Sequence, residues 1–419
     1  MIFALADCNN FYASCEEVFN PKLSDAPLII LSNNDGCVIA RSKKAKEWGV
    51  KMGDPAYLYK DHVERGSIQM LSSNFALYAD MSHRVMQTLE SYSPDMEIYS
   101  IDEAFFELKS SSDQQMGDDA LQMRQKVKKW TGIPVSIGIG PTKTLAKIAN
   151  VMAKKDAAKN GVCVLIDPAL IRSQLEKTAL EDIWGIGAAL AQRLRCKQIY
   201  TAAQLIDCDD SAIKKWLGTP GYRTALELRG TPCFSCQNVP EKKKSIICSR
   251  SFKQAVTEKA ALEEAIASFV SQAAEKLRSQ KSLTAFLSVF IATSPFIQPY
   301  YGPSCHVDLP NPTAYTPELI RLAKECLHRI VRPGLEYKKA GVLIGHFTDK
   351  GTGQTDWLAP VEENPKKTRL IETIDKINRR YDKNAVRFAA EGAEYSWQSA
   401  RKLVSPRYTT SWNELLIIH

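Results

Sequence analysis

Three acidic residues would form a cation site if the fold brought them together. Asp7 ends a short apolar run, and Asp102 and Glu103 are adjacent much later in the chain. Carboxylates without a neighbouring histidine or thiolate favour Mg²⁺ or Mn²⁺, and a pair of such ions can drive phosphoryl transfer. A polymerase, a nuclease or a cyclase would use such a site, and independent or salt-bridged surface acids are the alternative.

Two predicted strands must position these acids. Residues 2–8 indicate a buried strand that carries Asp7 at its carboxyl end. A helix follows at once, with Asn9 or Asn10 as its cap. Residues 97–108 alternate and are rich in aromatic and β-branched types, which predicts one strand with Asp102 and Glu103 in its middle. Two buried acids inside a strand require a positive partner.

Other elements surround these strands. Residues 27–31 and 36–40 predict a hairpin, and residues 118–131 predict a helix. A strand at 134–140 precedes a helix that begins at Pro141-Thr142. One edge of that helix is polar and mostly basic, with Lys143, Lys147, Asn150 and Lys154.

Gly185-Ile186-Gly187 joins two short predicted helices, as in a helix-hairpin-helix. The backbone N–H groups of such a glycine turn can bind a DNA phosphate without reading sequence. The alternative is a simple helical corner.

The second half of the chain has a different pattern. A linker at about 232–244 contains Pro232, Pro240 and a run of three lysines. Strand and helix patterns then follow in the order β-α-β-β-α-β, which predicts one sheet with two helices on a single face. Beyond residue 350 we expect a partner-binding tail without a core, with a poor helix near 368–380.

The composition sets broad limits. With 419 residues the chain should contain three or four domains, and its net charge of +8 suits nucleic acid but also many metabolic enzymes. An N-terminus without a signal peptide, and no apolar run of membrane-spanning length, predict a cytoplasmic protein without membrane contact. Cys233 and Cys236 form a single CxxC, which we interpret as ordinary thiols because structural zinc needs four ligands.

Four sequence motifs together resemble the Y-family DNA polymerases. In chain order they are DCNNFYASCEEVF, SNNDGCVIARS with GVKMGDP, YSIDEAF and IGIGPTKTLAKIAN. Further segments are similar to the UmuC branch, which includes the catalytic subunit of DNA polymerase V and mobile-element relatives such as RumB. These segments are SSNFALYADMS, IICSRSF, AAEKLRS, TSPF, PYYG, KKAGV and SPRYTT, so the resemblance covers nearly the whole chain.

The resemblance implies a multidomain α+β fold shaped like a right hand. It names a ferredoxin-like palm, small fingers, a helical thumb containing the helix-hairpin-helix, and a β-α-β-β-α-β little finger. The expected boundaries are palm 1–19 and 76–166, fingers 20–75, thumb 167–231, linker 232–244, little finger 245–349 and C-terminal tail 350–419.

The resemblance also assigns the acidic residues. Asp7, Asp102 and Glu103 match the catalytic metal ligands, and the backbone carbonyl of Cys8 would complete the set around two Mg²⁺ ions, with Mn²⁺ as a substitute. Tyr12 matches the steric gate, whose ring excludes a 2′-hydroxyl from the incoming sugar.

Several residues match positions that contact the incoming dNTP. The chain departs from the family at two of them, because Lys43-x-x-Lys46 replaces the common Tyr-x-x-Arg. At the second position, lysine offers a point charge instead of the bidentate fork of arginine. Packing within the first helix and in a strand is the alternative role for some of them. The nucleotide-binding candidates are Phe11, Tyr12, Ile39, Ala40, Lys43, Lys46 and Lys147.

The implied macromolecular contacts are more dispersed. The implied partners are primer-template DNA, a processed UmuD-like dimer, RecA and a sliding clamp. The segment QTDWL offers Gln354, Trp357 and Leu358 for the clamp. The DNA-binding candidates are Gly185, Gly187, Lys242, Lys243, Lys244 and Arg250.

The resulting prediction is an error-prone translesion polymerase that copies damaged DNA by two-metal-ion nucleotidyl transfer in SOS-type mutagenesis. A noncatalytic DNA-binding scaffold is the second hypothesis and a magnesium nuclease the third. A scaffold has no use for unpaired buried carboxylates, which argues for the enzyme.

Overall fold

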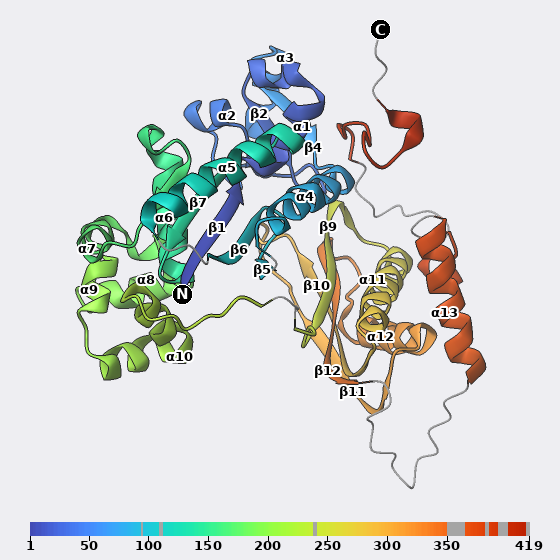
Figure 1. Cartoon of the computed structure of the whole chain (residues 1–419). Helices are drawn as coiled ribbons and strands as arrows, with labels where there is room; N and C mark the ends of the chain where they lie inside the picture. The colour runs from blue at the N-terminus through green and yellow to red at the C-terminus, as the bar shows by residue number, and fades with distance from the viewer. Residues whose placement is uncertain are drawn as a thin grey trace. The chain divides into compact units, whose positions relative to one another are not determined.

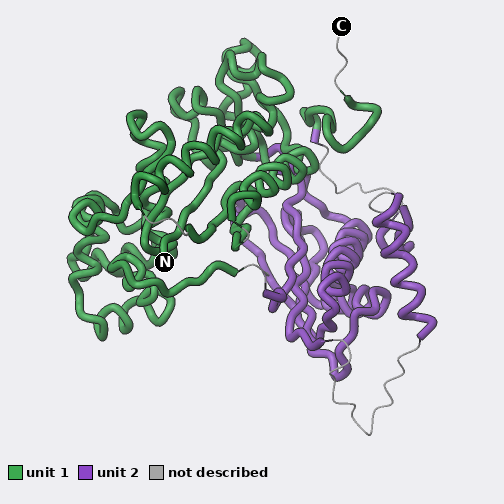
Figure 2. Tube along the Cα trace, in the orientation of Figure 1, with its two compact units in different colours: residues 1–32, 37–240, 402–419 green, residues 33–36, 241–401 purple. Residues whose placement is uncertain are grey.

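A computed structural model describes the chain except for residues 94, 109–111, 238–240, 350–364, 382–384, 393–400 and 416–419. It forms two compact units (Figure 2). Unit 1 contains residues 1–32, 37–240 and 402–419, and unit 2 contains residues 33–36 and 241–401. Within the described ranges, no helix combines the length and apolar character needed to cross a membrane.

A five-stranded sheet lies at the centre of unit 1, in the order β5-β6-β1-β7-β8. β1 lies between β6 and β7 (Figure 1) and pairs antiparallel with both, whereas β7 and β8 run parallel. The strands are β1 (Ile2–Cys8), β5 (Met96–Ile98), β6 (Glu103–Leu108), β7 (Val135–Gly140) and β8 (Val162–Val164).

Helices cover both faces of this sheet. Ala4 and Ala6 pack in one core with α1 (Phe11–Phe19), α4 (Phe75–Glu90) and α5 (Asp113–Thr131). Phe3 and Leu5 pack instead with Ala146 of α6 (Lys143–Lys155). Because side chains alternate along a strand, Asp7 shares the α6 face with Phe3 and Leu5.

Glycines allow α6 to approach the sheet closely. A Cβ added at Gly138 would lie 2.1 Å from the backbone nitrogen of Asn150, and one at Gly140 would lie 2.9 Å from the nitrogen of Ala146. The buried Asn150 amide donates to the Ser136 carbonyl oxygen at 2.8 Å. This contact fixes α6, and with it the basic edge that the sequence predicted, against the face that carries Asp7.

The predicted single strand at 97–108 is wrong. β5 ends at Ile98 and β6 begins at Glu103, and the two strands pair antiparallel as a hairpin. Ser100 Oγ accepts from the backbone nitrogens of Asp102 and Glu103, at 3.2 and 3.0 Å. The short serine side chain stabilises a turn that competes with the extended conformation. The acids therefore lie at the turn and strand start, not inside a strand.

A three-stranded sheet, also in unit 1, has the order β3-β2-β4. The predicted hairpin is confirmed, since β2 and β3 pair antiparallel. α2 begins after Ser42, whose hydroxyl accepts from the nitrogen of Ala45. The elements are η1 (Pro21–Asp25), β2 (Leu28–Leu31), β3 (Val38–Arg41), α2 (Lys43–Glu47), η2 (Ala56–Tyr59), α3 (Lys60–Glu64) and β4 (Gln69–Ser72).

A helical module completes unit 1 and shares a core with Leu145 and Ile148 of α6. α10 is kinked at Gly218, which adopts a non-helical conformation. The elements are η3 (Ala157–Lys159), α7 (Pro168–Lys177), η4 (Leu180–Asp182), α8 (Ala188–Arg195), α9 (Ala202–Ile206) and α10 (Asp210–Leu228).

Unit 2 is built on a four-stranded antiparallel sheet in the order β11-β10-β12-β9. Two helices pack in one core with the sheet, which confirms the predicted β-α-β-β-α-β order. Ile247 alternates with the core residues Ile246 and Cys248 and is 56% exposed on the opposite face. The elements are β9 (Ile246–Val256), α11 (Lys259–Ser279), β10 (Ser282–Thr293), β11 (Ser304–Thr313), α12 (Thr316–Ile330) and β12 (Tyr337–Asp349).

The expectation of a C-terminal tail without core contacts is wrong. In unit 2, α13 (Pro365–Arg380) buries Ile371, and its Asp375 pairs with Arg278 of α11 at 2.7 Å. The short η5 (Ala389–Glu391) follows in unit 2, whereas η6 (Trp412–Glu414) belongs to unit 1. Ile371, Ile374 and Ile377 recur at helical spacing, so the sequence carries an apolar stripe on this helix but not the surface that covers it.

Candidate active site

Strand pairing brings the three acids together. Asp7 at the end of β1 lies opposite Glu103 at the start of β6. One residue further, the Cys8 nitrogen donates to the Asp102 carbonyl oxygen at 2.8 Å. The side chains of Asp7 and Glu103 are only 12% and 20% exposed. The carboxylates therefore share one partly desolvated edge of the five-stranded sheet.

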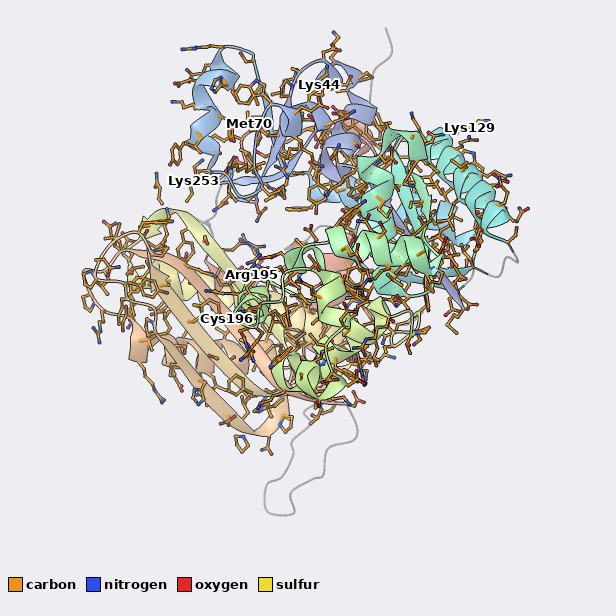
Figure 3. All side chains as sticks on the ribbon, turned by 90° about the vertical axis from the view of Figure 1, so that its left-hand side faces the viewer. Lys44, Met70, Lys129, Arg195, Cys196 and Lys253 are labelled. Atoms are coloured by element: carbon orange, nitrogen blue, oxygen red, sulfur yellow. The ribbon has the colours of Figure 1, made fainter. Side chains whose placement is uncertain are left out.

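Two lysines of α6 neutralise this edge. Lys154 Nζ lies 2.6 Å from Asp7 Oδ2, and Lys147 Nζ lies 2.8 Å from Glu103 Oε2. The two lysines are about two helical turns apart, so both face the sheet. The Lys147 ammonium also lies 4.6 Å from the centre of the Tyr99 ring. Lys129 of α5, in contrast, lies at the surface of unit 1 (Figure 3).

The environment of each acid differs. Burial raises the pKa of Asp7 to about 6, although Lys154 counteracts this shift, and the neighbouring Glu103 adds to it. One oxygen of Asp102 accepts from Ser100 Oγ at 2.5 Å. A charge-neutralising partner therefore favours the ionised form of Asp7.

A pocket beside the acids extends along α6 to the residues after η4. It is lined in part by Asp7, Glu103, Lys147, Lys154 and Trp184. Across the part of the chain that the structure describes, no three histidine, cysteine, aspartate or glutamate side chains are already spaced to hold a metal ion. The carboxylates of Asp7 and Glu103 pair with lysine ammonium groups, as the ion-pair distances show.

The start of α1 distinguishes its two aromatic residues. The helix begins at Phe11, and Asn10 adopts a left-handed conformation with φ 51° but makes no side-chain cap, contrary to the predicted capping role. Phe11 is 4% exposed and belongs to the core, whereas Tyr12 is half-buried. The Tyr12 ring stacks on Tyr78 with 4.4 Å between centroids.

Lys43 and Lys46 of α2 differ in their exposure and in the charges around them. Lys43 is exposed and lies 3.8 Å from Glu47. The pKa of Lys46 is lowered by desolvation and by repulsion from Arg41 and Lys154, while Asp7 opposes the shift. Lys46 therefore lies within electrostatic range of Asp7. Ile39 and Ala40 on β3 are half-buried against the core that holds Phe11.

The glycine turn before α8 has the backbone geometry that glycine permits. Gly185 has φ +87°, Ile186 is buried, and a Cβ at Gly187 would meet no atom within 4 Å. The turn joins η4 to α8, so the first of the two predicted helices is a 3₁₀ turn. Its open glycine surface remains a candidate phosphate contact.

The basic candidates of unit 2 occupy separate places. Lys242 pairs with Asp349 at 2.5 Å, and Lys243 and Lys244 are exposed. Arg250 is exposed, but it is two residues from each of the core residues Cys248 and Phe252, so it lies on the same, helix-covered side of its strand. Gln354, Trp357 and Leu358 lie outside the described residues.

Sequence reasoning missed three contributors to the site. Lys154 was assigned only to a basic edge, and its spacing from Lys147 was the available signal. Ser100 supports the acidic turn, and a Ser-x-Asp pattern is typical of such turns. Trp184 donates from Nε1 to the Tyr99 hydroxyl at 3.0 Å, a contact that no sequence pattern indicates.

Comparison with known proteins gives whole-length matches. The chain is 41% identical to Protein UmuC of Salmonella typhimurium and 37% identical to Protein MucB of Escherichia coli, each over 99% of both chains. The family model described as impB/mucB/samB matches residues 6–151, and the model of that family's C-terminal domain matches residues 243–357. A domain of unknown function matches residues 368–418.

Solved structures confirm the fold class. A Y-family polymerase chimera of Dbh and Dpo4 covers 84% of this chain with a TM-score of 0.67 at 21% identity, and all of that chain is matched. DinB from Sulfolobus solfataricus matches over the same share with a TM-score of 0.51 at 20% identity. These structures have the expected multidomain α+β polymerase fold. Together with the whole-length relatives, they identify the chain as a member of the impB/mucB/samB family, the UmuC branch of the Y-family DNA-directed DNA polymerases.

Proposed function

We propose that this polymerase extends primers opposite damaged template bases by error-prone, two-metal-ion nucleotidyl transfer in SOS-type DNA damage tolerance. The observation that carries the mechanism is the pairing of Asp7 with Glu103, next to the Cys8–Asp102 backbone hydrogen bond. Membership of the UmuC branch supports translesion synthesis as the reaction, with DNA and dNTPs as substrates.

The donor set fits divalent cations. Carboxylates and a backbone carbonyl are the hard oxygen ligands that Mg²⁺ prefers, with Mn²⁺ as a substitute. Positive charge is already stabilised at this edge, where lysine Nζ atoms lie 2.6 and 2.8 Å from carboxylate oxygens. Asp7, Asp102, Glu103 and the Cys8 carbonyl would hold two ions, which stabilise the attacking and leaving oxygens of nucleotidyl transfer when bound.

The remaining side chains would bind and orient the nucleotide. Lys147 is held beside Glu103 and would exchange this carboxylate for a triphosphate oxygen. Lys46 adds positive charge near Asp7, and the N–H groups at the start of α1 favour phosphate. Tyr12, the second residue of α1, presents a half-buried ring that would exclude a 2′-hydroxyl.

We assign DNA contacts to the glycine turn at Gly185 and Gly187 and to basic residues of unit 2. The partners proposed from the UmuC relatives are a processed UmuD-like dimer and RecA, with a sliding clamp bound through Gln354, Trp357 and Leu358. Extension across an abasic site, with and without activated RecA and the UmuD-like dimer, tests these partners.

Primer extension by the purified full-length chain tests the chemistry. Asp102→Asn should reduce incorporation on an undamaged template by about 10³-fold, because it removes one anionic ligand from the metal pair. A chelator should abolish synthesis, and Mg²⁺ or Mn²⁺ should restore it.

Asp118→Asn is the matched control, because this exposed acid of α5 lies on the helix layer opposite α6. It should leave the rate unchanged. Primer degradation in place of extension, or full activity of Asp102→Asn, would contradict the proposed chemistry.

A further inference from the structure

The terminal segment 402–415, called the strap below, packs on unit 1. The Ser72 nitrogen donates to the Leu403 carbonyl oxygen at 2.9 Å, and the Leu403 nitrogen donates to Ser72 Oγ at 3.1 Å. Tyr408 stacks on Phe19 at the end of α1, with 4.9 Å between centroids. The strap therefore contacts β4 and α1, although it is far from both in sequence.

Asn74 joins the strap to α4. Its Oδ1 accepts from the Leu77 nitrogen and so caps the helix. Its Nδ2 lies 2.9 Å from Ser405 Oγ and 3.1 Å from the Ser405 carbonyl oxygen. The residue that caps α4 is thus also the residue that holds Ser405 in place.

A buried carboxylate connects Ser405 to the interior. Glu16 of α1 is 1% exposed, and its Oε1 accepts from Ser405 Oγ at 3.0 Å and from the Tyr78 hydroxyl at 2.7 Å. A buried carboxylate is costly unless donors surround it. The strap therefore supplies one of these two donors, the Ser405 hydroxyl.

Tyr78 in turn supports Tyr12. The Tyr78 ring is fully buried and lies almost parallel to the Tyr12 ring, at an interplanar angle of 14°. Phe75, also on α4, contacts the Tyr12 ring edge-on at 6.0 Å. Tyr12 is half-buried, so these contacts and not a closed core determine where its ring lies.

We propose that Ser405 is a positioning residue for sugar discrimination, which acts through Glu16 and Tyr78 to fix the ring of Tyr12. The proposal rests on the proposed function of Tyr12 as the residue that excludes the 2′-hydroxyl. It gives a role to part of the C-terminal region that matches a domain of unknown function. A steric gate excludes the 2′-hydroxyl only if its ring cannot move aside. The series of contacts from Ser405 through Glu16 and Tyr78 would restrain the Tyr12 ring in this way.

Single-nucleotide incorporation by the full-length chain, with a dNTP and the matching rNTP, tests the proposal. Ser405→Ala removes one donor to Glu16 and should lower the ratio of kcat/KM for dNTP over rNTP by about 3- to 10-fold, the equivalent of one hydrogen bond. The kcat/KM for the dNTP itself should change less than about twofold, since the metal ligands are untouched.

Tyr78→Phe is the second variant, because it keeps the stacked ring but removes the hydroxyl that donates to Glu16. It should lower selectivity to a similar extent. The double variant should lose less than the product of the two single effects, because both act through one carboxylate. Glu16→Gln keeps an acceptor oxygen and should retain most of the selectivity.

Two controls separate the possible results. Tyr12→Ala should lower selectivity most, and unchanged selectivity in this variant would refute the gate assignment itself. Trp412→Ala alters the same strap at a side chain that is 89% exposed and should have no effect. If Tyr12→Ala loses selectivity while Ser405→Ala and Tyr78→Phe do not, the strap has no positioning role. An equal loss in Trp412→Ala would also overturn the proposal.

Discussion

The five-stranded sheet of unit 1 and the four-stranded sheet of unit 2 bury their residues differently. Helices cover both faces of the first sheet, so the acids at its edge are partly desolvated and paired with lysines. In the second, α11 and α12 pack on one face, and Ile247 on the other is 56% exposed. The sheet of unit 1 suits chemistry that depends on individual charges. The sheet of unit 2 suits a broad surface contact.

Lysine side chains also differ between the two units, in how far their positions are fixed. Lys147 is held between Glu103 and the Tyr99 ring, so its charge has a fixed position. Lys243 and Lys244 of unit 2 are exposed and retain their rotamer freedom. A fixed charge provides orientation, whereas mobile surface charges provide salt-dependent attraction to a polyanion.

Of the effects that test this contrast between the two sheets, the largest is expected at Lys147. Lys147→Ala should lower kcat/KM for dNTP incorporation by about 10²-fold, the cost of one charge-assisted contact to the triphosphate. Lys147→Arg should recover part of the loss, because it keeps the charge. Steady-state kinetics on an undamaged template measures both. Wild-type kinetics in Lys147→Ala would show that the fixed lysine only neutralises Glu103.

The next effect concerns packing. Gly138→Ala places a Cβ within 2.1 Å of the α6 backbone and should lower the free energy of unfolding by about 1–3 kcal/mol or more. Gly345→Ala in β12 meets atoms no closer than 3.8 Å and should change it by less than about 0.5 kcal/mol. Denaturant unfolding of both variants checks the contrast, and equal losses would contradict it.

A smaller effect is expected on DNA affinity. The double variant Lys243→Ala/Lys244→Ala should reduce the slope of log Kd against log salt by about 2, one for each lost phosphate contact. Lys128→Ala/Lys129→Ala is the matched control, an adjacent exposed pair at the end of α5. Binding titrations at several salt concentrations provide the slopes. An unchanged slope in the unit 2 variant would remove these lysines from the DNA contact.

The smallest effect is a pH dependence of stability at Glu16. Burial raises the pKa of this carboxyl from its ordinary 4.5, so the folded state binds a proton more readily than the unfolded state. The contribution of Glu16 to the free energy of unfolding should fall as pH rises from about 4.5 through the raised pKa, then stay constant. Its titratable neighbours Cys15, Tyr78 and Tyr408 also have raised pKa values, so they remain neutral in this range. Glu16→Gln should remove this slope in unfolding measurements across pH.

Local patterns predicted much of the fold. Periodicity and turn residues predicted the strand that ends near Asp7, the hairpin at 27–40 and the β-α-β-β-α-β order. The structure confirms all of these. The prediction of one continuous strand at 97–108 was wrong because the Ser100 side chain stabilises a turn within it. The packing of the strap on unit 1 was not predicted because single anchors such as Tyr408 leave no periodic pattern.

The residue types of the site could be identified from the sequence: three hard acids, a tyrosine close to the first of them and a basic helix edge. Which of these groups meet depends on the folded chain. Asp7 pairs with Lys154 because glycines let α6 approach the sheet, and Ser405 reaches Glu16 across 389 residues. Residue type fixes what a group can bind, but long-range contacts depend on how strands pair and helices pack, which local spacing does not record.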